Sequence, residues 1–127
     1  MATQIQANRP TVMVVEDEFI IALDLAETAR DLGYEVKGPF PGKRDAFHYL
    51  ADNRPDFAIL DVFTDDGEVY PLADALTEAG VPIIFHSGHV PPAEVCERYP
   101  QARAASKPCP PNEMIAMMQG ALGEAKH

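Results

Sequence analysis

Cysteines, basic residues and long apolar runs are scarce in this sequence of 127 residues. The two cysteines, Cys96 and Cys109, form neither a disulfide framework nor a zinc-ligand spacing, so we expect free thiols in a reducing, cytoplasmic compartment. No apolar run is long enough to span a bilayer, and residues 1–10 lack the apolar segment of a secretion signal. A secreted disulfide scaffold, a zinc domain and a membrane protein are therefore disfavoured.

Positive charge is also scarce, with 10 lysines and arginines against 20 aspartates and glutamates and a net charge of −10. The few basic residues form no cluster, which argues against a nucleic-acid partner, and the negative charge argues equally against an anionic membrane. The length suits one folded unit with a single core. We expect residues 1–10 to be a flexible N-terminal lead-in and residues 11–127 to form one domain.

What the sequence has is an alternation of apolar, β-rich runs and helical patterns. Strands are expected at Thr11–Val15, Glu35–Pro39, Phe57–Asp61, Val81–Phe85 and Ala102–Ser106. Helices are expected at Phe19–Leu32, Lys43–Ala51, Tyr70–Ala79, Pro92–Arg98 and from Asn112 to about Leu122. Strands separated by helices of this size pair in parallel with right-handed crossovers. The pattern predicts an α/β fold, a doubly wound parallel sheet of five strands with five helices.

Local signals refine these elements. Glu35–Pro39 is short and polar, so we expect it near an edge of the sheet, and Gly33 is expected to cap the end of the first helix. Residues 62–67 are expected to form a turn and residues 86–89 a loop. The apolar stripes facing the sheet are predicted as Ile21, Leu25, Thr28 and Leu32 in the first helix, and Ala46, Phe47 and Leu50 in the second.

Carboxylates stand where two of the expected strands end. Glu16 and Asp17 come directly after the first strand, and Asp61 ends the third, which is short and apolar enough to be buried on both faces. All carboxyl ends of a parallel sheet lie along one edge, where open α/β folds bind their ligands. Close carboxylates repel one another unless a cation lies among them, and Mg²⁺ prefers such oxygen ligands. The cluster therefore predicts a Mg²⁺ site.

Ser87, Gly88 and Lys107 follow the fourth and fifth strands and belong to the same edge. Ser87 offers a hydroxyl donor, Gly88 allows an anion to approach the backbone, and Lys107 supplies a positive charge suited to a phosphoryl oxygen. Each group is also common without a function, as an acid at a helix N-terminus, a loop hydroxyl or a surface lysine. Their arrangement at successive strand ends favours phosphoryl transfer, with a carboxylate able to act as covalent acceptor.

At these positions the sequence resembles the bacterial response-regulator receiver domains of two-component systems. The resemblance rests on Val14–Glu18, Ile59–Val62, Ile84–Gly88 and Ser106–Pro108, and it covers residues 11–122. It implies the flavodoxin-like strand order 2-1-3-4-5. It also implies a stand-alone regulator that accepts a phosphoryl group from a histidine kinase or a histidine phosphotransfer protein, and that catalyses only its own phosphorylation and dephosphorylation.

The same resemblance assigns a role to each site residue. Asp61 is the implied phosphoacceptor, and Ser87 is the implied switch hydroxyl, with Gly88 beside it. Lys107 is implied to contact the phosphoryl group. The implied Mg²⁺ ligands are Glu16, Asp17, Asp61 and the backbone carbonyl of Phe63.

Pro82–His89 also resembles the PFxFATGY stretch of the FATGUY receivers, with departures. Serine replaces threonine at position 87, histidine replaces a small residue at position 86, and Phe63-Thr64 replaces the usual Asn-Leu. The aromatic residue that many receivers carry three positions before the lysine is Ala104 here. His86 and His89 have a spacing that could bind a transition metal, but we expect them to line the mouth of the pocket or to pack on the sheet.

Three other functions remain open from the residues. An aspartyl-nucleophile phosphatase would need a second aspartate two positions after Asp61, where Phe63 stands. A pseudo-receiver would keep the pocket idle and act only by docking. A flavin-binding protein would need a phosphate-cradling loop after the first strand, where residues 16–18 are all acidic and would repel phosphate.

The first helix carries a candidate docking patch for the phosphodonor. Phe19, Ile20 and Leu23 are apolar but lie off the predicted core stripe, at the mouth of the acidic pocket. Exposed apolar side chains in such a position suit docking of a helix. The alternative is a broadly buried helix in which these residues belong to the core. We expect a monomer or a weak dimer.

Overall fold

The computed structural model describes residues 9–125, and the predicted lead-in therefore lies largely outside the described residues. Five parallel strands form the central sheet: β1 (Thr11–Val15), β2 (Glu35–Phe40), β3 (Phe57–Leu60), β6 (Ile83–Ser87) and β7 (Arg103–Ser106). Their order is β2-β1-β3-β6-β7, which is 2-1-3-4-5 when these strands are counted along the chain. The predicted fold class and the edge position of the second strand are confirmed.

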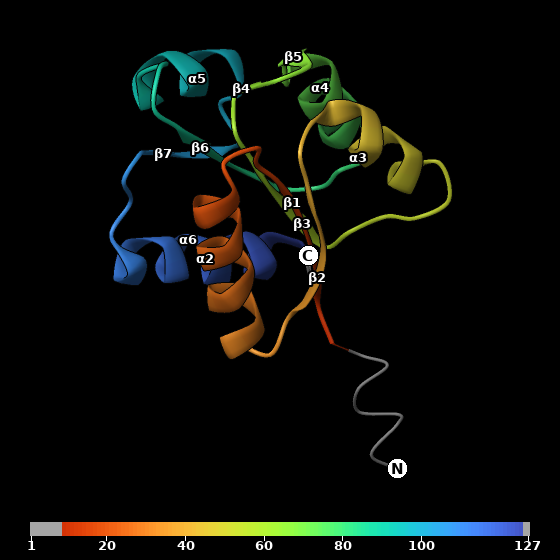
Figure 1. Ribbon diagram of the computed structural model, residues 1–127, viewed down its shortest axis with the longest axis vertical. Helices are drawn as coiled ribbons and strands as arrows, with labels where there is room; N and C mark the ends of the chain where they lie inside the picture. Colours follow the sequence, from red (N-terminus) through yellow and green to blue (C-terminus); the bar gives the residue numbers. More distant parts are fainter. Residues whose placement is uncertain (1–8, 126–127) are drawn as a thin grey trace.

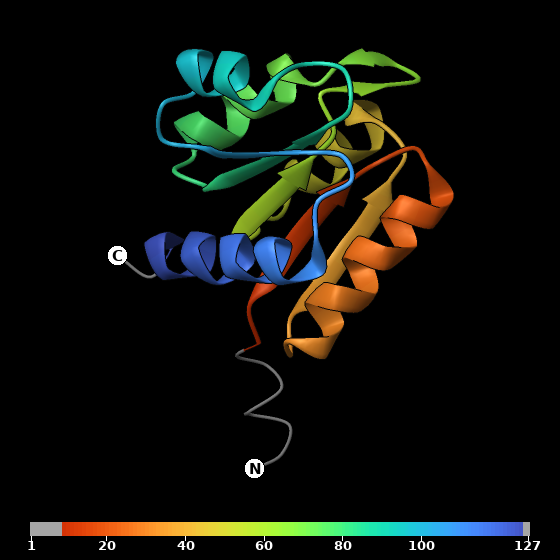
Figure 2. The ribbon, with the colours of Figure 1, turned by 90° about the vertical axis from the view of Figure 1, so that its left-hand side faces the viewer.

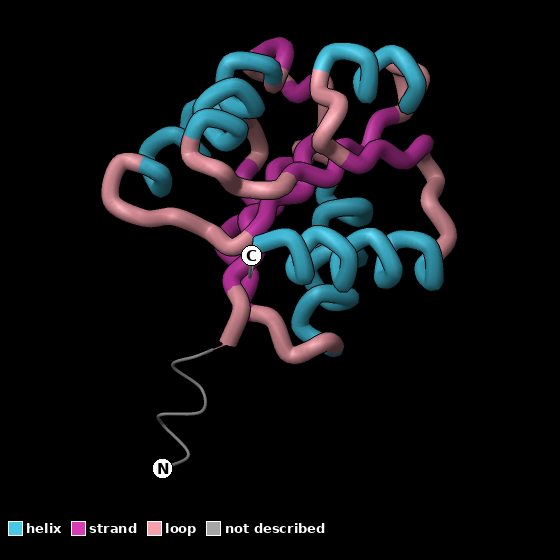
Figure 3. Tube along the Cα trace, turned by 180° about the vertical axis from the view of Figure 1, so that it is seen from behind, coloured by secondary structure: helices cyan, strands magenta, loops and turns pink. Residues whose placement is uncertain are grey.

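Helices cover both faces of the sheet (Figures 1 and 2). They are α2 (Phe19–Asp31), α3 (Lys43–Leu50), α4 (Tyr70–Glu78), α5 (Pro92–Arg98) and α6 (Pro111–Ala125). Helices α2 and α6 lie on one face, and α3, α4 and α5 lie on the other, as the view from behind in Figure 3 also shows. Within residues 9–125, no helix has both the length and the apolar character that crossing a membrane requires.

Alternation along the buried strands divides the core between these two layers. Val12 and Val14 of β1 pack with α2 and α6, whereas Met13 and Val15 pack with the helices of the opposite face. Successive side chains of a strand point to opposite faces, so an apolar run serves both layers. In β6 the same alternation sends Ile84 toward α2 and α6, and the next residue on that face is His86.

The strand register brings the ends of β1, β3 and β6 to one level. Val15 pairs with Leu60, and Leu60 pairs with Phe85. Ser87 pairs with Ser106 at the end of β7. The residues that follow each strand therefore meet at the carboxyl edge of the sheet.

Several local predictions were wrong, and the reasons are tertiary. Residues 62–67 are part of a small antiparallel hairpin, β4 (Phe63–Thr64) and β5 (Gly67–Glu68), rather than a simple turn. His86 and Ser87 belong to β6 and not to a loop, because β7 pairs with them. The last helix extends to Ala125. Strand β6 begins two residues later than predicted, at Ile83.

The predicted helix stripes were also only partly right. In α2 the fully buried residues are Ala22, Leu25, Ala26 and Ala29, so small side chains form most of the contact with the sheet. Ile21, Thr28 and Leu32 are half-buried at the side of this stripe. In α3 only Ala46 is fully buried. Phe47, predicted to face the sheet, is 38% exposed.

Gly33 acts at the end of α2 as predicted. Its φ of 89° lies in the left-handed region, which glycine adopts without steric cost. The N–H of Tyr34 donates to the carbonyl of Ala29, and the N–H of Gly33 donates to the carbonyl of Arg30. These bonds satisfy carbonyls that the helix end leaves free, and they direct the chain into β2.

Candidate functional site

Three carboxylates converge where β1 and β3 end. One ligand oxygen from each of Glu16, Asp17 and Asp61 lies within 4.8 Å of the others. The backbone holds them there, since the N–H of Glu16 donates to Phe40 (2.9 Å) and the N–H of Asp61 donates to Val15 (2.9 Å). Glu16 and Asp61 are buried and Asp17 is half-buried. Elsewhere in residues 9–125 no other group of three or more potential ligand side chains is found.

Lys107, which follows β7, places its ammonium group among these carboxylates. Its Nζ lies 3.0 Å from Oδ2 of Asp61 and 2.9 Å from Oε1 of Glu16. It also lies 3.5 Å from Oε1 of Glu18, a contact that the sequence did not indicate. The Lys107 side chain is only 12% exposed, so these ion pairs are poorly screened by water.

Burial dominates the electrostatics of the site. It raises the pKa of Glu16 to about 7, against the opposing effects of Lys107 and of the Glu18 N–H that donates to Oε2 (3.1 Å). Burial alone would lower the pKa of Lys107, but its contacts with Glu16 and Asp61 raise it overall. A single lysine thus faces more negative charge than it can neutralise.

The donor set fits a hard divalent cation. Within residues 9–125, Oε1 of Glu16 is buried and has the Lys107 ammonium 2.9 Å away, but no further hydrogen-bond donor. Carboxylate oxygens are the ligands that Mg²⁺ takes in proteins, usually together with waters and phosphate oxygens. The Glu16, Asp17 and Asp61 cluster could therefore hold Mg²⁺.

Ser87 is buried at the end of β6, beside the Lys107 segment. Its Oγ accepts hydrogen bonds from the N–H groups of His89 (3.3 Å) and Val90 (3.2 Å). The N–H of Lys107 donates to the carbonyl of Ser87 (3.0 Å), which fixes the two predicted residues next to each other. A Cβ on Gly88 would meet Lys107 only at ordinary contact distance, 3.6 Å, so the space at this position does not itself require glycine.

Comparison with curated proteins finds relatives that are named as regulators. No protein-family model matches the chain. It is 39% identical over 51 residues to the transcriptional regulatory protein PdtaR of Mycobacterium tuberculosis, covering 40% of this chain and 25% of that protein. It is 28% identical over 114 residues to the phyllosphere-induced regulator PhyR of Methylorubrum extorquens, covering 87% and 43%. The chain thus spans less than half the length of these curated relatives.

Solved structures show the architecture more completely. A response regulator receiver protein from Sinorhizobium medicae superimposes with a TM-score of 0.82 at 20% identity, over 94% of this chain and 98% of that one. The fold is that of CheY-like response-regulator receiver domains. In this receiver fold the carboxylates and Lys107 lie at the carboxyl edge of the sheet, as the sequence predicted.

His86 packs on the sheet, one of the two positions expected for it. It is buried on the α2 and α6 side of the sheet, and within residues 9–125 neither ring nitrogen has a hydrogen-bond partner. Burial, and next the charge of Lys107, lower its pKa, so the ring is neutral near pH 7. His86 lines a groove of about 710 Å³ between α2 and α6, together with Glu18, Lys107 and Met114.

Phe63 and His89 lie at the outer surface of the site. Their rings meet edge to face with centroids 6.4 Å apart, and both residues are exposed. His89 also lines the groove between α2 and α6, whereas His86 is buried on the sheet. Neither histidine belongs to a group of three potential metal ligands in the described part of the chain.

The predicted docking residues are the most exposed large apolar side chains of α2. Phe19 is 77% exposed, Ile20 72% and Leu23 41%. Phe19 and Leu23 border a hollow of about 260 Å³ that Glu16 and Asp17 also line. The broadly buried alternative for this helix is therefore wrong, since the small residues of α2 form its core contact.

Proposed function

We propose that this chain is a Mg²⁺-dependent receiver that accepts a phosphoryl group on Asp61 from a histidine kinase or a histidine phosphotransfer protein. The observation that carries the proposal is the buried Asp61 carboxylate, 3.0 Å from Lys107 and within 4.8 Å of two further carboxylates. A buried carboxylate between a cation and a candidate metal site is suited to act as a nucleophile. The names of PdtaR and PhyR, both regulators, agree with a signalling role.

In the proposed reaction an oxygen of Asp61 forms a bond to phosphorus while the phosphorus–nitrogen bond of phosphohistidine breaks. The imidazole leaves with the electron pair, and the product is an acyl phosphate on Asp61. Mg²⁺, held by Glu16, Asp17, Asp61 and the carbonyl of Phe63, would neutralise charge on the phosphoryl oxygens.

The chain's own residues supply the other roles. Lys107 moves its ion pair from the Asp61 carboxylate to a phosphoryl oxygen, and Ser87 donates its hydroxyl to another. Ser87 already lies against the Lys107 backbone, so both donors reach the same edge. We assign no activity on other substrates, because Phe63 stands where a phosphatase would need a second aspartate.

The proposed partner docks on Phe19, Ile20 and Leu23. These side chains are exposed on the helix that follows Glu16 and Asp17, so a partner helix placed there would bring a phosphohistidine toward Asp61. We place this partnership in the cytoplasm, with the receiver as a monomer or weak dimer. The Pro82–His89 stretch supports a place in the FATGUY subclass.

The test of the acceptor is incubation with Mg²⁺ and a small acyl-phosphate donor, followed by intact mass measurement. One added phosphoryl group is expected in the unaltered protein, and none in Asp61→Asn or in the presence of a chelator. Asp74→Asn is the matched control, because Asp74 is a carboxylate of α4 bonded to Tyr99 and not to Lys107. Equal labelling of the Asp61→Asn variant would contradict the assignment.

The test of docking is Ile20→Ala combined with Leu23→Ala. Phosphorylation by a cognate kinase should fall sharply, while labelling by the small donor and the melting temperature should change little, because both side chains are exposed. A parallel loss of stability and of both phosphorylation routes would show that the residues support the core instead.

A pseudo-receiver is the second candidate, and one observation favours it. Lys107 already neutralises part of the charge on Glu16 and Asp61, so the pocket can exist without a metal or a phosphoryl group. Failure of the unaltered protein to label with the small donor, together with unchanged stability in Mg²⁺, would support this reading.

A further inference from the structure

The β4–β5 hairpin, which carries Phe63, is too short to be stable by itself. Each strand has two residues, paired as Phe63 with Glu68 and Thr64 with Gly67. A two-stranded hairpin of this size is marginal in water by itself. Its placement must therefore come from contacts with the rest of the molecule.

Asp66, at the tip of this hairpin, makes those contacts with the start of α3. Its carboxylate accepts the N–H of Lys43 (3.2 Å) through Oδ1 and the N–H of Arg44 (3.0 Å) through Oδ2. Within the hairpin, Oδ1 of Asp66 also accepts a hydrogen bond from the hydroxyl of Thr64 (2.8 Å). From α3, the Lys43 ammonium donates to the backbone carbonyl of Asp66.

Helix α3 lacks a cap of its own, which explains why a carboxylate from elsewhere fits there. Its N-cap residue is Gly42, which has no side chain to accept the first N–H groups of the helix. A Cβ at position 42 would lie 2.5 Å from Oδ1 of Asp66, so the absence of a side chain also makes room for the carboxylate. The backbone at Gly42 is extended (φ −164°), a conformation open to any residue.

This contact links two segments that each lie a few residues along the chain from a contact of the acidic site. On one side, Phe40 at the end of β2 accepts the N–H of Glu16, and α3 begins three residues later at Lys43. On the other side, the hairpin begins with Phe63, two residues after Asp61. We infer that Asp66 is a positioning residue that ties the hairpin to α3 and thereby holds the Phe63 carbonyl at the site where Mg²⁺ binds. This inference rests on the proposed function.

The test is the affinity for Mg²⁺, measured by isothermal titration calorimetry on the full chain. Removing a group that orients a metal ligand typically lowers metal affinity by about 10- to 100-fold. Asp66 does not touch the Phe63 carbonyl directly but positions it through the backbone of the hairpin. We therefore expect Asp66→Ala to weaken Mg²⁺ binding by about ten-fold, the lower end of that range. Asp66→Asn keeps an acceptor that caps helices well and should weaken it less.

Asp65→Ala is the matched control. It removes the same charge from the same hairpin, but Asp65 is exposed and makes no hydrogen bond or ion pair seen within residues 9–125. Its Mg²⁺ affinity should stay within about two-fold of the unaltered protein, because an exposed, solvated charge is largely screened by salt. If Asp65→Ala and Asp66→Ala weaken binding equally, only charge is involved and the inference is wrong.

A second variant disturbs the same contact from the other side, and its melting temperature and Mg²⁺ affinity together separate positioning from simple capping. Gly42→Ala keeps Asp66 but pushes its carboxylate off the helix, so it should weaken Mg²⁺ binding in the same direction. A lower melting temperature of either variant with unchanged Mg²⁺ affinity would show a structural cap only and would overturn the inference while leaving the proposed function intact. No Mg²⁺ binding by the unaltered protein would contradict the proposed function, and the inference with it.

Discussion

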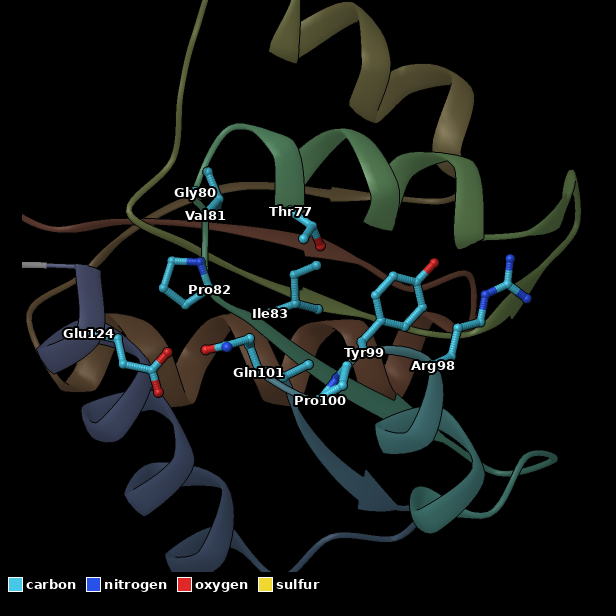
Figure 4. A pocket seen from close by; sticks show the side chains of 11 residues that line it. Thr77, Gly80, Val81, Pro82, Ile83, Arg98, Tyr99, Pro100, Gln101 and Glu124 are labelled. Atoms are coloured by element: carbon cyan, nitrogen blue, oxygen red, sulfur yellow. The ribbon is translucent and has the colours of Figure 1, made fainter.

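The two edges of the sheet hold polar residues in different ways. At the carboxyl edge, buried Glu16 and Asp61 share one ammonium group with half-buried Asp17 nearby. At the amino edge of β6 and β7 lies a cavity of about 350 Å³, lined from α4, β6, the segment before β7 and α6 (Figure 4). Pro82, Ile83 and Tyr99 line it together with polar residues such as Thr77 and Gln101.

Tyr99 and Arg98, which line this cavity, find partners in α4. The Tyr99 hydroxyl donates to Asp74 (2.7 Å), and the Arg98 guanidinium lies 3.9 Å from the centre of the Tyr70 ring. Among the described residues that line the cavity, one carboxylate, Glu124, stands against one guanidinium, Arg98, unlike the excess of negative charge at the other edge. A buried charge cluster with too few counterions lowers stability, whereas satisfied pairs do not. The contrast indicates that the carboxyl edge is arranged for a ligand and the amino edge for stability.

Removing Lys107 should change the carboxyl edge most. Lys107→Ala leaves buried carboxylates without a cation, and breaking such a buried pair costs about 3 kcal/mol of unfolding free energy in Mg²⁺-free buffer. Labelling by a small acyl-phosphate donor should fall about 100-fold, since a preorganised charge is lost. Chemical denaturation and intact mass measure the two effects. Lys37→Ala breaks the surface pair with Glu35 and is the control, with little change expected in either.

Adding Mg²⁺ should neutralise part of the excess negative charge at the carboxyl edge and so raise the stability of the fold. A ligand selective for the folded state raises its stability by about 1.4 kcal/mol at roughly ten times its Kd. Thermal melts should show this shift in the unaltered protein and in Tyr99→Phe, but much less in Asp17→Ala. An equal shift in Asp17→Ala would place the bound cation elsewhere.

The pH dependence of stability should come from the carboxyl edge. Burial raises the pKa of Glu16 from 4.5 to about 7, so between these values the folded state binds more protons than the unfolded state. The stability contributed by this group is complete below pH 4.5 and is lost as pH rises through about 7, and roughly 1 kcal/mol of that loss falls between about pH 6 and 8. Denaturation in Mg²⁺-free buffer should show this decline, and Glu16→Gln should flatten it. A decline that persists in Glu16→Gln would assign it to another group.

The smallest effect is expected at the amino edge. Burial and the bond to Asp74 raise the pKa of Tyr99 to about 12, so its hydroxyl stays protonated and donates at neutral pH. Tyr99→Phe removes that hydrogen bond and should cost about 0.5–1 kcal/mol, with labelling by the acyl phosphate unchanged. A loss of labelling in this variant would show that the two edges are coupled.

Sequence reasoning was most accurate where the chemistry is local. The apolar runs of β1 and β3 predicted buried parallel strands, and the residues after them were therefore expected at one edge. Phe47 shows the limit of such reasoning, because a helical stripe gives the direction of a side chain but not the width of the surface that covers it. His86 shows the same limit, since pairing with β7 extends β6 past the apolar run.

By itself, then, the sequence determined the alternation of strands and helices, the strand order expected from its motifs, and the identity of the carboxylates and the lysine at the sheet edge. Only the tertiary structure decided that Lys107 pairs with Glu16 as well as Asp61, that His86 is buried without a partner among residues 9–125, and that Asp66 binds the start of α3. The physical reason is that these contacts join residues far apart in the chain, from 22 positions for Arg44 and Asp66 to 91 positions for Glu16 and Lys107. Such contacts depend on strand register and crossover geometry, which no local pattern of residues specifies.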